Sequence, residues 1–260
     1  MEMRMMTGAA LMAAVFVMGG GTLEAREGLP IPRTGVVDSP GLYVLQGDRR
    51  VFAPDRAGIT ITASDVTLDL NGYAITGLGG KMGVGIRVMG ARGVKVMNGF
   101  VSNNAFGVVV MNSSNVVVSG LQIRGEGLPV VAPPPETGIM IVQSRNVVVE
   151  GNTIDNTGLG IFVRGGMSRG NRIVNNTLTA GTNGVLGICY NPADGDANGP
   201  IGDLIYGNAI SGFNTGIQAS ATSRYNVFKE NTVFFTTGMA VELLNPTNMD
   251  MDNTKVDLQP

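Results

Sequence analysis

The sequence predicts an all-β protein, built as a single-stranded right-handed parallel β-helix of about eight or nine coils with three short strands per coil. Two observations predict this fold. First, a glycine followed by a short apolar run recurs at intervals of 22, 31, 22, 24, 32 and 22 residues, so three intervals are equal and the others contain an insertion. Second, alternate positions in these runs are apolar, the period of a strand with one buried face, and residues 59–243 show no sustained helical period.

The recurring glycine begins the first strand of each predicted coil. A second strand follows it, as at residues 94–96, 116–118 and 147–149, and a third comes after a short gap. One coil cannot bury its own inner face, so we expect the coils to stack and to build one long apolar column. The glycines that define the repeat are Gly85, Gly107, Gly138, Gly160, Gly184, Gly216 and Gly238.

Asparagine recurs between the second and third strands, at Asn152, Asn176, Asn208 and Asn231. Asparagine tolerates the left-handed backbone of a tight corner, and stacked amides hydrogen-bond along a column. We therefore expect these residues to be structural rather than ligand-binding.

The repeat unit resembles the parallel β-helix repeats of the pectate lyase-like superfamily, including its carbohydrate-binding and sugar-hydrolase repeat group. Residues 59–77 (ITITASDVTLDLNGYAITG) look like an opening coil, and 41–45 (GLYVL) look like the strand that enters such a helix. The resemblance covers roughly residues 40–243. It implies the fold directly and the reaction only loosely, because this scaffold carries many activities.

The first 25 residues have the pattern of a secretory signal peptide. Arg4 supplies the positive charge, and residues 9–18 form an apolar run that is too short to cross a bilayer. We therefore expect an exported protein, periplasmic or extracellular, with no membrane span. The predicted organisation is a signal peptide at 1–25, an N-terminal cap with entry strands at 26–58, the β-helix at 59–244 and a C-terminal cap or tail at 245–260.

The composition excludes several classes of function. The chain has 260 residues, 18 basic and 20 acidic side chains, no histidine and one cysteine. Without a basic surplus, nucleic acid is a poor partner. Without histidine or a cysteine cluster, a zinc site or a histidine base is excluded, and chemistry must use carboxylates, Lys, Arg or Tyr. Cys189 is expected to be a lone, buried thiol.

The outer side of the first strands is predicted to carry the functional face. Two insertions flank this face, at 125–137 (GEGLPVVAPPPET) and 189–202 (CYNPADGDANGPIG), and the space between them is the predicted cleft. The face is mostly apolar, so it is either covered by protein or serves as a platform for sugar rings. The predicted substrate-binding residues are Met140, Phe162, Leu186 and Gln218.

The second insertion also contains half of a calcium-binding motif. Asp194, Asp196 and Asn198 follow the pattern D-x-D-x-[DN]-G, in which alternating oxygen ligands converge on one Ca²⁺ ion. The position of the usual bidentate glutamate is Ile205, so Asp203 is the candidate for the missing ligand. The alternative is a polar surface turn without a metal.

Arg164 and Tyr190 are the candidate catalytic residues. A lyase on this scaffold needs a group that neutralises the uronate carboxylate and a base near C5. Arg164 is a candidate for either role and suits neutralisation better, because it stays protonated. Tyr190 is the candidate phenolic acid or base, and Asp194 or Asp196 would position a cation. Glycoside hydrolysis would instead need two carboxyl groups, and Asp194, Asp196 and Asp203 are the available ones. The alternative for Arg164 is a solvated surface charge.

Two functional hypotheses follow. In the first, the protein binds a polysaccharide in the cleft between the insertions, with lyase-type cleavage as an extension. In the second, it is a non-catalytic structural or interaction protein whose apolar outer face docks a subunit or partner, in a homo-oligomer for example. The absence of histidine favours the second hypothesis, and the family resemblance favours the first.

Overall fold

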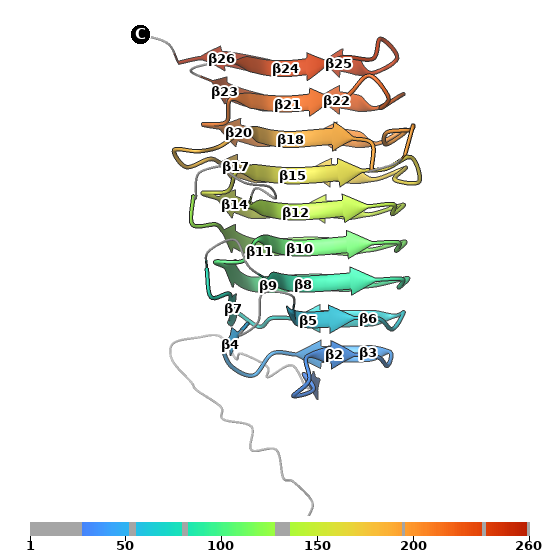
Figure 1. Ribbon diagram of the computed structural model, residues 1–260, viewed down its shortest axis with the longest axis vertical. Helices are drawn as coiled ribbons and strands as arrows, with labels where there is room; N and C mark the ends of the chain where they lie inside the picture. The colour runs from blue at the N-terminus through green and yellow to red at the C-terminus, as the bar shows by residue number, and fades with distance from the viewer. Residues whose placement is uncertain are drawn as a thin grey trace, which may run out of the picture.

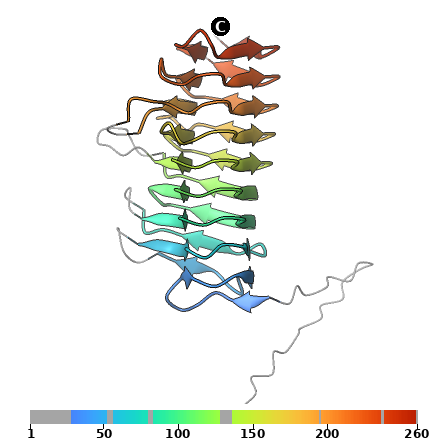
Figure 2. The ribbon, with the colours of Figure 1, turned by 90° about the vertical axis from the view of Figure 1, so that its right-hand side faces the viewer.

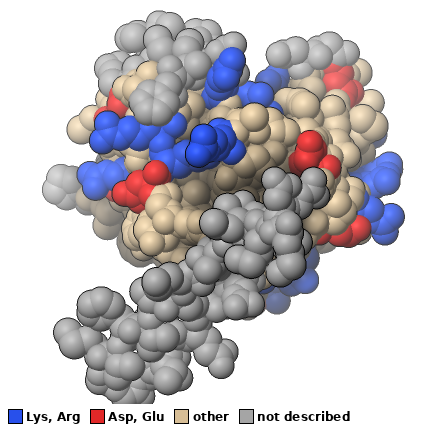
Figure 3. Space-filling view, turned by 90° about the horizontal axis from the view of Figure 1, so that it is seen from below, with Lys and Arg blue, Asp and Glu red and all other residues tan. Residues whose placement is uncertain are grey.

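The computed structural model describes residues 28–51, 56–79, 83–127, 136–193, 196–235 and 238–258, so the predicted signal peptide lies outside the described residues. The described residues form short parallel strands and no helix, stacked coil upon coil into a column (Figure 1). Each coil turns through three sides, and Figure 2 shows the stack turned by 90° about its long axis. Figure 3 views the molecule from the N-terminal end of the stack. The predicted all-β parallel β-helix is therefore confirmed.

One side of the column is a nine-stranded parallel sheet, and a 17-stranded sheet forms the other two sides by bending at a corner. The strands of the nine-stranded sheet are β2 (Val36–Val37), β5 (Ala57–Ile61), β8 (Val84–Met89), β10 (Phe106–Met111), β12 (Thr137–Val142), β15 (Leu159–Arg164), β18 (Leu186–Asn191), β21 (Thr215–Ala219) and β24 (Met239–Leu243).

In the larger sheet, β9 and β11 run through the corner and contribute to both sides. Its strands are β1 (Leu29–Pro30), β3 (Gly41–Val44), β4 (Arg49–Arg50), β6 (Val66–Asp69), β7 (Ala74–Thr76), β9 (Lys95–Ser102), β11 (Val117–Arg124), β13 (Val148–Glu150), β14 (Thr153–Asp155), β16 (Arg172–Val174), β17 (Thr177–Thr179), β19 (Leu204–Tyr206), β20 (Ala209–Ser211), β22 (Val227–Lys229), β23 (Thr232–Phe235), β25 (Met249–Met251) and β26 (Thr254–Asp257).

The coils extend beyond residues 59–244. At the N-terminal end, β2 pairs with β5. At the C-terminal end, β25 pairs with β22 and β26 pairs with β23. The segments predicted as caps therefore add strands to the stack.

The inside of the column is apolar, as the alternation predicts. Ile86 pairs with Val108, Val108 with Ile139 and so on up the nine-stranded sheet, and each of these side chains is fully buried. A single coil would leave its inner side chains open to solvent above and below. Stacking the coils buries these side chains. The column consists of Ile59, Ile86, Val108, Ile139, Ile161, Ile188 and Ile217.

The repeated glycine lies at a point where the coils leave no room for a side chain. A Cβ atom on Gly107 would lie 2.5 Å from the carbonyl oxygen of Gly138, and the same close approach joins Gly160 to Gly187. The sequence-based assignment of Gly184 to this column is therefore wrong, because the coil contains three extra residues before Gly187. This offset changes which side chains of β18 face outward.

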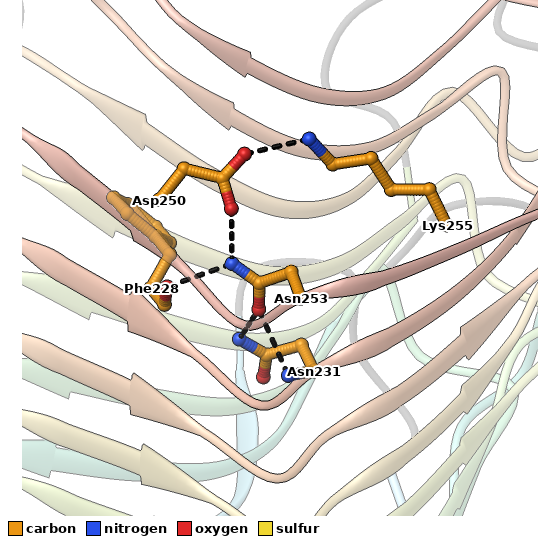
Figure 4. A network of polar contacts seen from close by, with 5 residues as sticks. All are labelled: Phe228, Asn231, Asp250, Asn253 and Lys255. Atoms are coloured by element: carbon orange, nitrogen blue, oxygen red, sulfur yellow. Dashed lines mark hydrogen bonds and ion pairs between the residues drawn. The ribbon is translucent and has the colours of Figure 1, made fainter.

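The predicted asparagine ladder is confirmed. The Asn176 side-chain oxygen accepts hydrogen bonds from both the backbone N–H and the amide of Asn152, each at 3.0 Å, and Asn208 and Asn231 repeat the arrangement. Asn253 continues the ladder above Asn231 and donates to Asp250, which also pairs with Lys255 (Figure 4). Asn152, Asn176, Asn208 and Asn231 are buried, so each of these amides replaces the hydrogen bonds that water would give.

Candidate functional site

The candidate site is the outward side of the nine-stranded sheet, here called the outer face. The register of the coils places its side chains in columns that run along the stack, two of which are described here. One column contains Arg87, Val109, Met140, Phe162, Cys189, Gln218 and Glu242, and the other contains Met89, Met111, Val142, Arg164 and Asn191.

The N-terminal half of the outer face is apolar and concave. A cavity of about 330 Å³ lies over β8, β10 and β12. Apolar side chains with one cation at the edge are typical of a surface that takes an apolar part of a ligand. The cavity is lined by Val84, Arg87, Met89, Phe106, Val109, Met111 and Met140.

The C-terminal half of the outer face is polar. The guanidinium of Arg164 lies over the Phe162 ring, 5.2 Å from its centroid, in a cation–π contact. Two coils further on, the amide of Gln218 donates to the Glu242 carboxylate at 2.6 Å. The predicted residues Met140, Phe162, Arg164 and Gln218 therefore lie on one continuous face.

The register brings Cys189, rather than Leu186, next to Phe162. Leu186 pairs with Leu159 at the start of the strand, so it lies outside the column of Phe162, in the register row that begins with Val84 and Phe106. The Cys189 thiol is buried and forms no disulfide, as predicted. Burial raises the pKa of this thiol to about 12. It is therefore a packed thiol rather than a nucleophile.

Tyr190 lies inside the column, and its prediction as a surface acid or base is wrong. It follows Ile188 by two residues, so both side chains point inward, and it is fully buried. Its ring packs edge-on against Phe228, with centroids 5.7 Å apart. Burial, with the nearby Asp203 carboxyl as a second cause, raises the pKa of the phenol well above its ordinary value. A phenol in this position reaches no ligand on the outer face.

The second insertion is shorter than predicted, because Cys189 and Tyr190 belong to β18 and the loop begins after Asn191. It leaves β18 at the end of the strand, whereas the first insertion enters β12 at its beginning, so the two approach the outer face from opposite edges. Residues 128–135 of the first insertion lie outside the described residues.

The described members of the predicted calcium set do not converge on one point. Asp196 accepts hydrogen bonds from Gly166 N–H at 2.8 Å and from the Gln143 amide at 3.1 Å, and its other oxygen accepts from Asn198 N–H at 2.9 Å. The hydrogen bond from Gly166 is the first cause that lowers the pKa of Asp196. One carboxylate oxygen thus accepts two hydrogen bonds and the other accepts one, so the carboxylate is held in place by N–H donors.

The remaining members of the set are also occupied or distant. The Asn198 side-chain oxygen accepts from the Arg224 guanidinium at 3.0 Å. Asp203 is buried inside the column, where its carboxylate accepts two hydrogen bonds from Asn171, so its prediction as a surface ligand is wrong. Asp194 lies outside the described residues, and within them no three His, Cys, Asp or Glu side chains are grouped as a metal site. Because Asp194 lies outside the described residues, the calcium site stays a prediction, in which Asp203 does not take part at the surface.

The chain belongs to the family of proteins with a right-handed beta helix region, whose match spans residues 47–192. Among solved structures, it is similar to an alginate lyase from Paenibacillus sp. str. FPU-7, with a TM-score of 0.57 and 14% identity over 83% of this chain and 90% of that one. It is also similar to the Dettilon tailspike protein, with a TM-score of 0.56 and 17% identity over 85% of this chain and 53% of that one.

A third similar structure is a hyperthermoactive exopolygalacturonase from Thermotoga maritima, with a TM-score of 0.51 and 8% identity over 80% of this chain and 67% of that one. At these identities the likeness shows a shared fold, and the chain spans about half of the tailspike protein. A comparison with curated proteins finds no match. In the described part of the chain, no helix is long and apolar enough to cross a membrane.

Proposed function

We propose that this protein is exported and binds a polysaccharide along the outer face of the nine-stranded sheet. A sugar ring has an apolar C–H side and a rim of hydroxyl groups, so it needs an apolar surface next to hydrogen-bonding groups. Three of the solved structures similar to this chain carry the names of polysaccharide-active enzymes, an alginate lyase, an alginate epimerase and an exopolygalacturonase, which supports this class of ligand.

The observation that carries the proposal is the junction between the two halves of the outer face. Met140 and Phe162 are register partners and are half-buried, and Arg164 reaches over the Phe162 ring. Gln218, with its amide held by Glu242, follows two coils later. An apolar surface thus borders a cation and an amide along one line, in the direction that a linear polymer would take.

The same face favours binding over cleavage. Arg164 is suited to neutralise a uronate carboxylate, but Tyr190, the predicted base, is buried inside the column. Hydrolysis needs two carboxyl groups about 5–9.5 Å apart. Among the described residues in the two outer-face columns, Glu242 is the one carboxylate, and it is hydrogen-bonded to Gln218.

The test is binding of a panel of acidic and neutral polysaccharides by the full exported chain, measured by calorimetry. We expect Phe162→Ala to weaken binding about tenfold, because it removes the ring and the support of the Arg164 guanidinium. Phe100→Ala is the matched control, since Phe100 is an exposed ring on β9 of the other sheet. Unchanged binding by Phe162→Ala, or no binding to any polymer, contradicts the proposal. Absorbance of an unsaturated product monitors lyase activity in the same samples.

A second candidate function is supported by the apolar cavity over β8, β10 and β12, which a protein subunit could cover. In that case the protein would form an oligomer through Met89 and Met111, which are register partners on the outer face. Sedimentation of the wild type and of Met111→Glu tests this function. A dimer that Met111→Glu dissociates favours docking, and a monomer in both favours the polysaccharide.

A further inference from the structure

We infer that a column of arginines along one corner of the β-helix binds an acidic polysaccharide as a linear polyanion that lies parallel to the helix axis. The inference rests on the proposed function for the class of polymer, but it uses a different surface from the outer face. It names the kind of polysaccharide, one whose carboxylate or sulfate groups repeat along the chain.

The column lies at the turns that connect the nine-stranded sheet to the next side of the helix, along the right-hand edge of Figure 1. Single β-bridges join the equivalent residue of each successive turn, so these positions are in register from coil to coil. Neighbouring positions are therefore about 4.8 Å apart. In order, the column contains Arg92, Ser114, Arg145, Arg169, Ile201 and Arg224.

The positive charges in this column are not neutralised within the described residues. Arg92, Arg145 and Arg169 are exposed, and no described carboxylate forms an ion pair with them. The nearby Asp196 carboxylate keeps its negative charge and accepts hydrogen bonds from Gln143 and Gly166, so the corner has a surplus of cations with one carboxylate beside it. Like charges on directly paired positions repel one another, and Arg145 and Arg169 are such a pair. The column is therefore unfavourable by itself and is stabilised when anionic groups lie along it.

The corner also offers groups that suit sugar hydroxyls. A cavity of about 220 Å³ lies beside Ser114, the position where the column has a small residue between two arginines. Asn112 contributes an amide and Ser114 a hydroxyl group to its wall. At the far end, Tyr225 follows Arg224 and is 61% exposed, which offers a ring face for a pyranose. Arginines at coil spacing, a polar cavity and an exposed ring together fit an acidic polysaccharide better than a polymer without hydroxyl groups.

The test compares a triple variant, Arg92→Gln, Arg145→Gln and Arg169→Gln, with the wild type for binding to polygalacturonate, dextran sulfate and neutral dextran. We expect the variant to bind the two acidic polymers at least about tenfold more weakly at low salt. The slope of log K against log salt concentration should fall in magnitude by about two, since three fewer cations release counterions. A stronger effect on one acidic polymer distinguishes carboxylate from sulfate.

The matched control removes the same net charge elsewhere, with Arg124→Gln, Lys229→Gln and Lys255→Gln on the 17-stranded sheet. Its binding should remain close to that of the wild type. The inference is overturned if the corner variant binds as the wild type does, if the control weakens binding equally, or if single-stranded DNA binds as tightly as the acidic polysaccharides. In each of these cases the proposed function stands whenever Phe162→Ala still weakens binding, so the two failures are distinguishable.

Discussion

Asp203 occupies a place that the neighbouring coils give to asparagine. Asn171, Asp203, Asn226 and Asn248 form a second buried ladder at the corner, in which each backbone N–H donates to the side chain one coil further on. A carboxylate at this place lacks the amide donor of its neighbours. Burial raises the pKa of Asp203 from 3.8 to about 7, although the hydrogen bonds from Asn171 oppose the rise. Below about pH 7, this carboxyl is therefore mostly protonated in the folded protein.

The first prediction concerns stability against pH. Because the folded pKa of Asp203 is raised above its unfolded value, its contribution to the free energy of unfolding is fully present below pH 4 and is lost as the pH rises through 7. Asp203→Asn cannot ionise, so we expect it to be more stable than the wild type at pH 8, by about 2–4 kcal/mol. Urea unfolding at pH 5 and pH 8 measures this difference. Equal pH dependence in the two proteins would show that Asp203 is not the titrating group.

The second prediction concerns calcium. Since the Asn198 side-chain oxygen accepts from Arg224 and Asp203 is buried, we expect 5 mM Ca²⁺ to leave the unfolding temperature within about 1 °C of its value in chelator. Thermal unfolding of the wild type and of Asp196→Asn, with and without Ca²⁺, gives the measurement. A Ca²⁺-dependent rise in the wild type that Asp196→Asn abolishes would establish the calcium site predicted from the sequence motif.

At the residue scale, the sequence predicts less of the site than of the fold. Phe162 and Arg164 are placed correctly because their coil follows the regular repeat. Tyr190 is placed wrongly, and Leu186 is assigned to the wrong column, because their coil has two glycines three residues apart. Only packing shows that Gly187 is the one in the glycine column. Asp203 is equivalent to Asn171 and Asn226 of the neighbouring coils. Its inward position could have been predicted only by aligning these residues, which occur once in each coil.

At the scale of elements, the asparagine ladder joins β-strands on two sides of the helix and depends on every member. The backbone N–H and amide of Asn176 both donate to Asn208, and Asn208 in turn donates to Asn231. Asn208 also donates to the carbonyl oxygen of Ile173. Removing one amide therefore leaves several buried polar groups without partners on the coils below and above. This ladder was predictable because it repeats in four coils.

The third prediction follows from this arrangement. We expect Asn208→Ala to lower the free energy of unfolding by about 2–4 kcal/mol, because buried donors of Asn176 and an acceptor of Asn231 lose their partner. Asn214→Ala is the control, since Asn214 is exposed and has no side-chain hydrogen bond among the described residues. Chemical denaturation of both variants gives the values. Equal losses in the two variants would mean that the ladder contributes nothing beyond an ordinary surface asparagine.

At the scale of the whole molecule, stability is a sum over coils and the contacts between neighbouring coils. Nearly every strand pairs only with the strands directly before and after it in the stack. Equivalent positions also carry similar side chains, since Ile205 is stacked on Ile173 and lies below Phe228. The fold could be predicted from the sequence for this reason, because one repeating unit determines the contacts of the next.

The fourth prediction is that one coil can be removed without loss of the fold. Asp203 and Asn226 are equivalent and lie 23 residues apart, so deletion of residues 203–225 joins Gly202 directly to Asn226 in the correct register. We expect a soluble monomer with a far-UV spectrum of β-structure and an unfolding temperature several degrees below the wild type, because one set of coil contacts is lost. The deletion of residues 203–214 is the control. It removes β19 and β20 but keeps β21, so the strands that follow the deletion would stack on strands of a different side of the column. We therefore expect this variant to aggregate. If the deletion of 203–214 folded as well as the deletion of 203–225, the register between coils would not determine this fold. If the deletion of 203–225 failed to fold, neighbouring coils would not be interchangeable units.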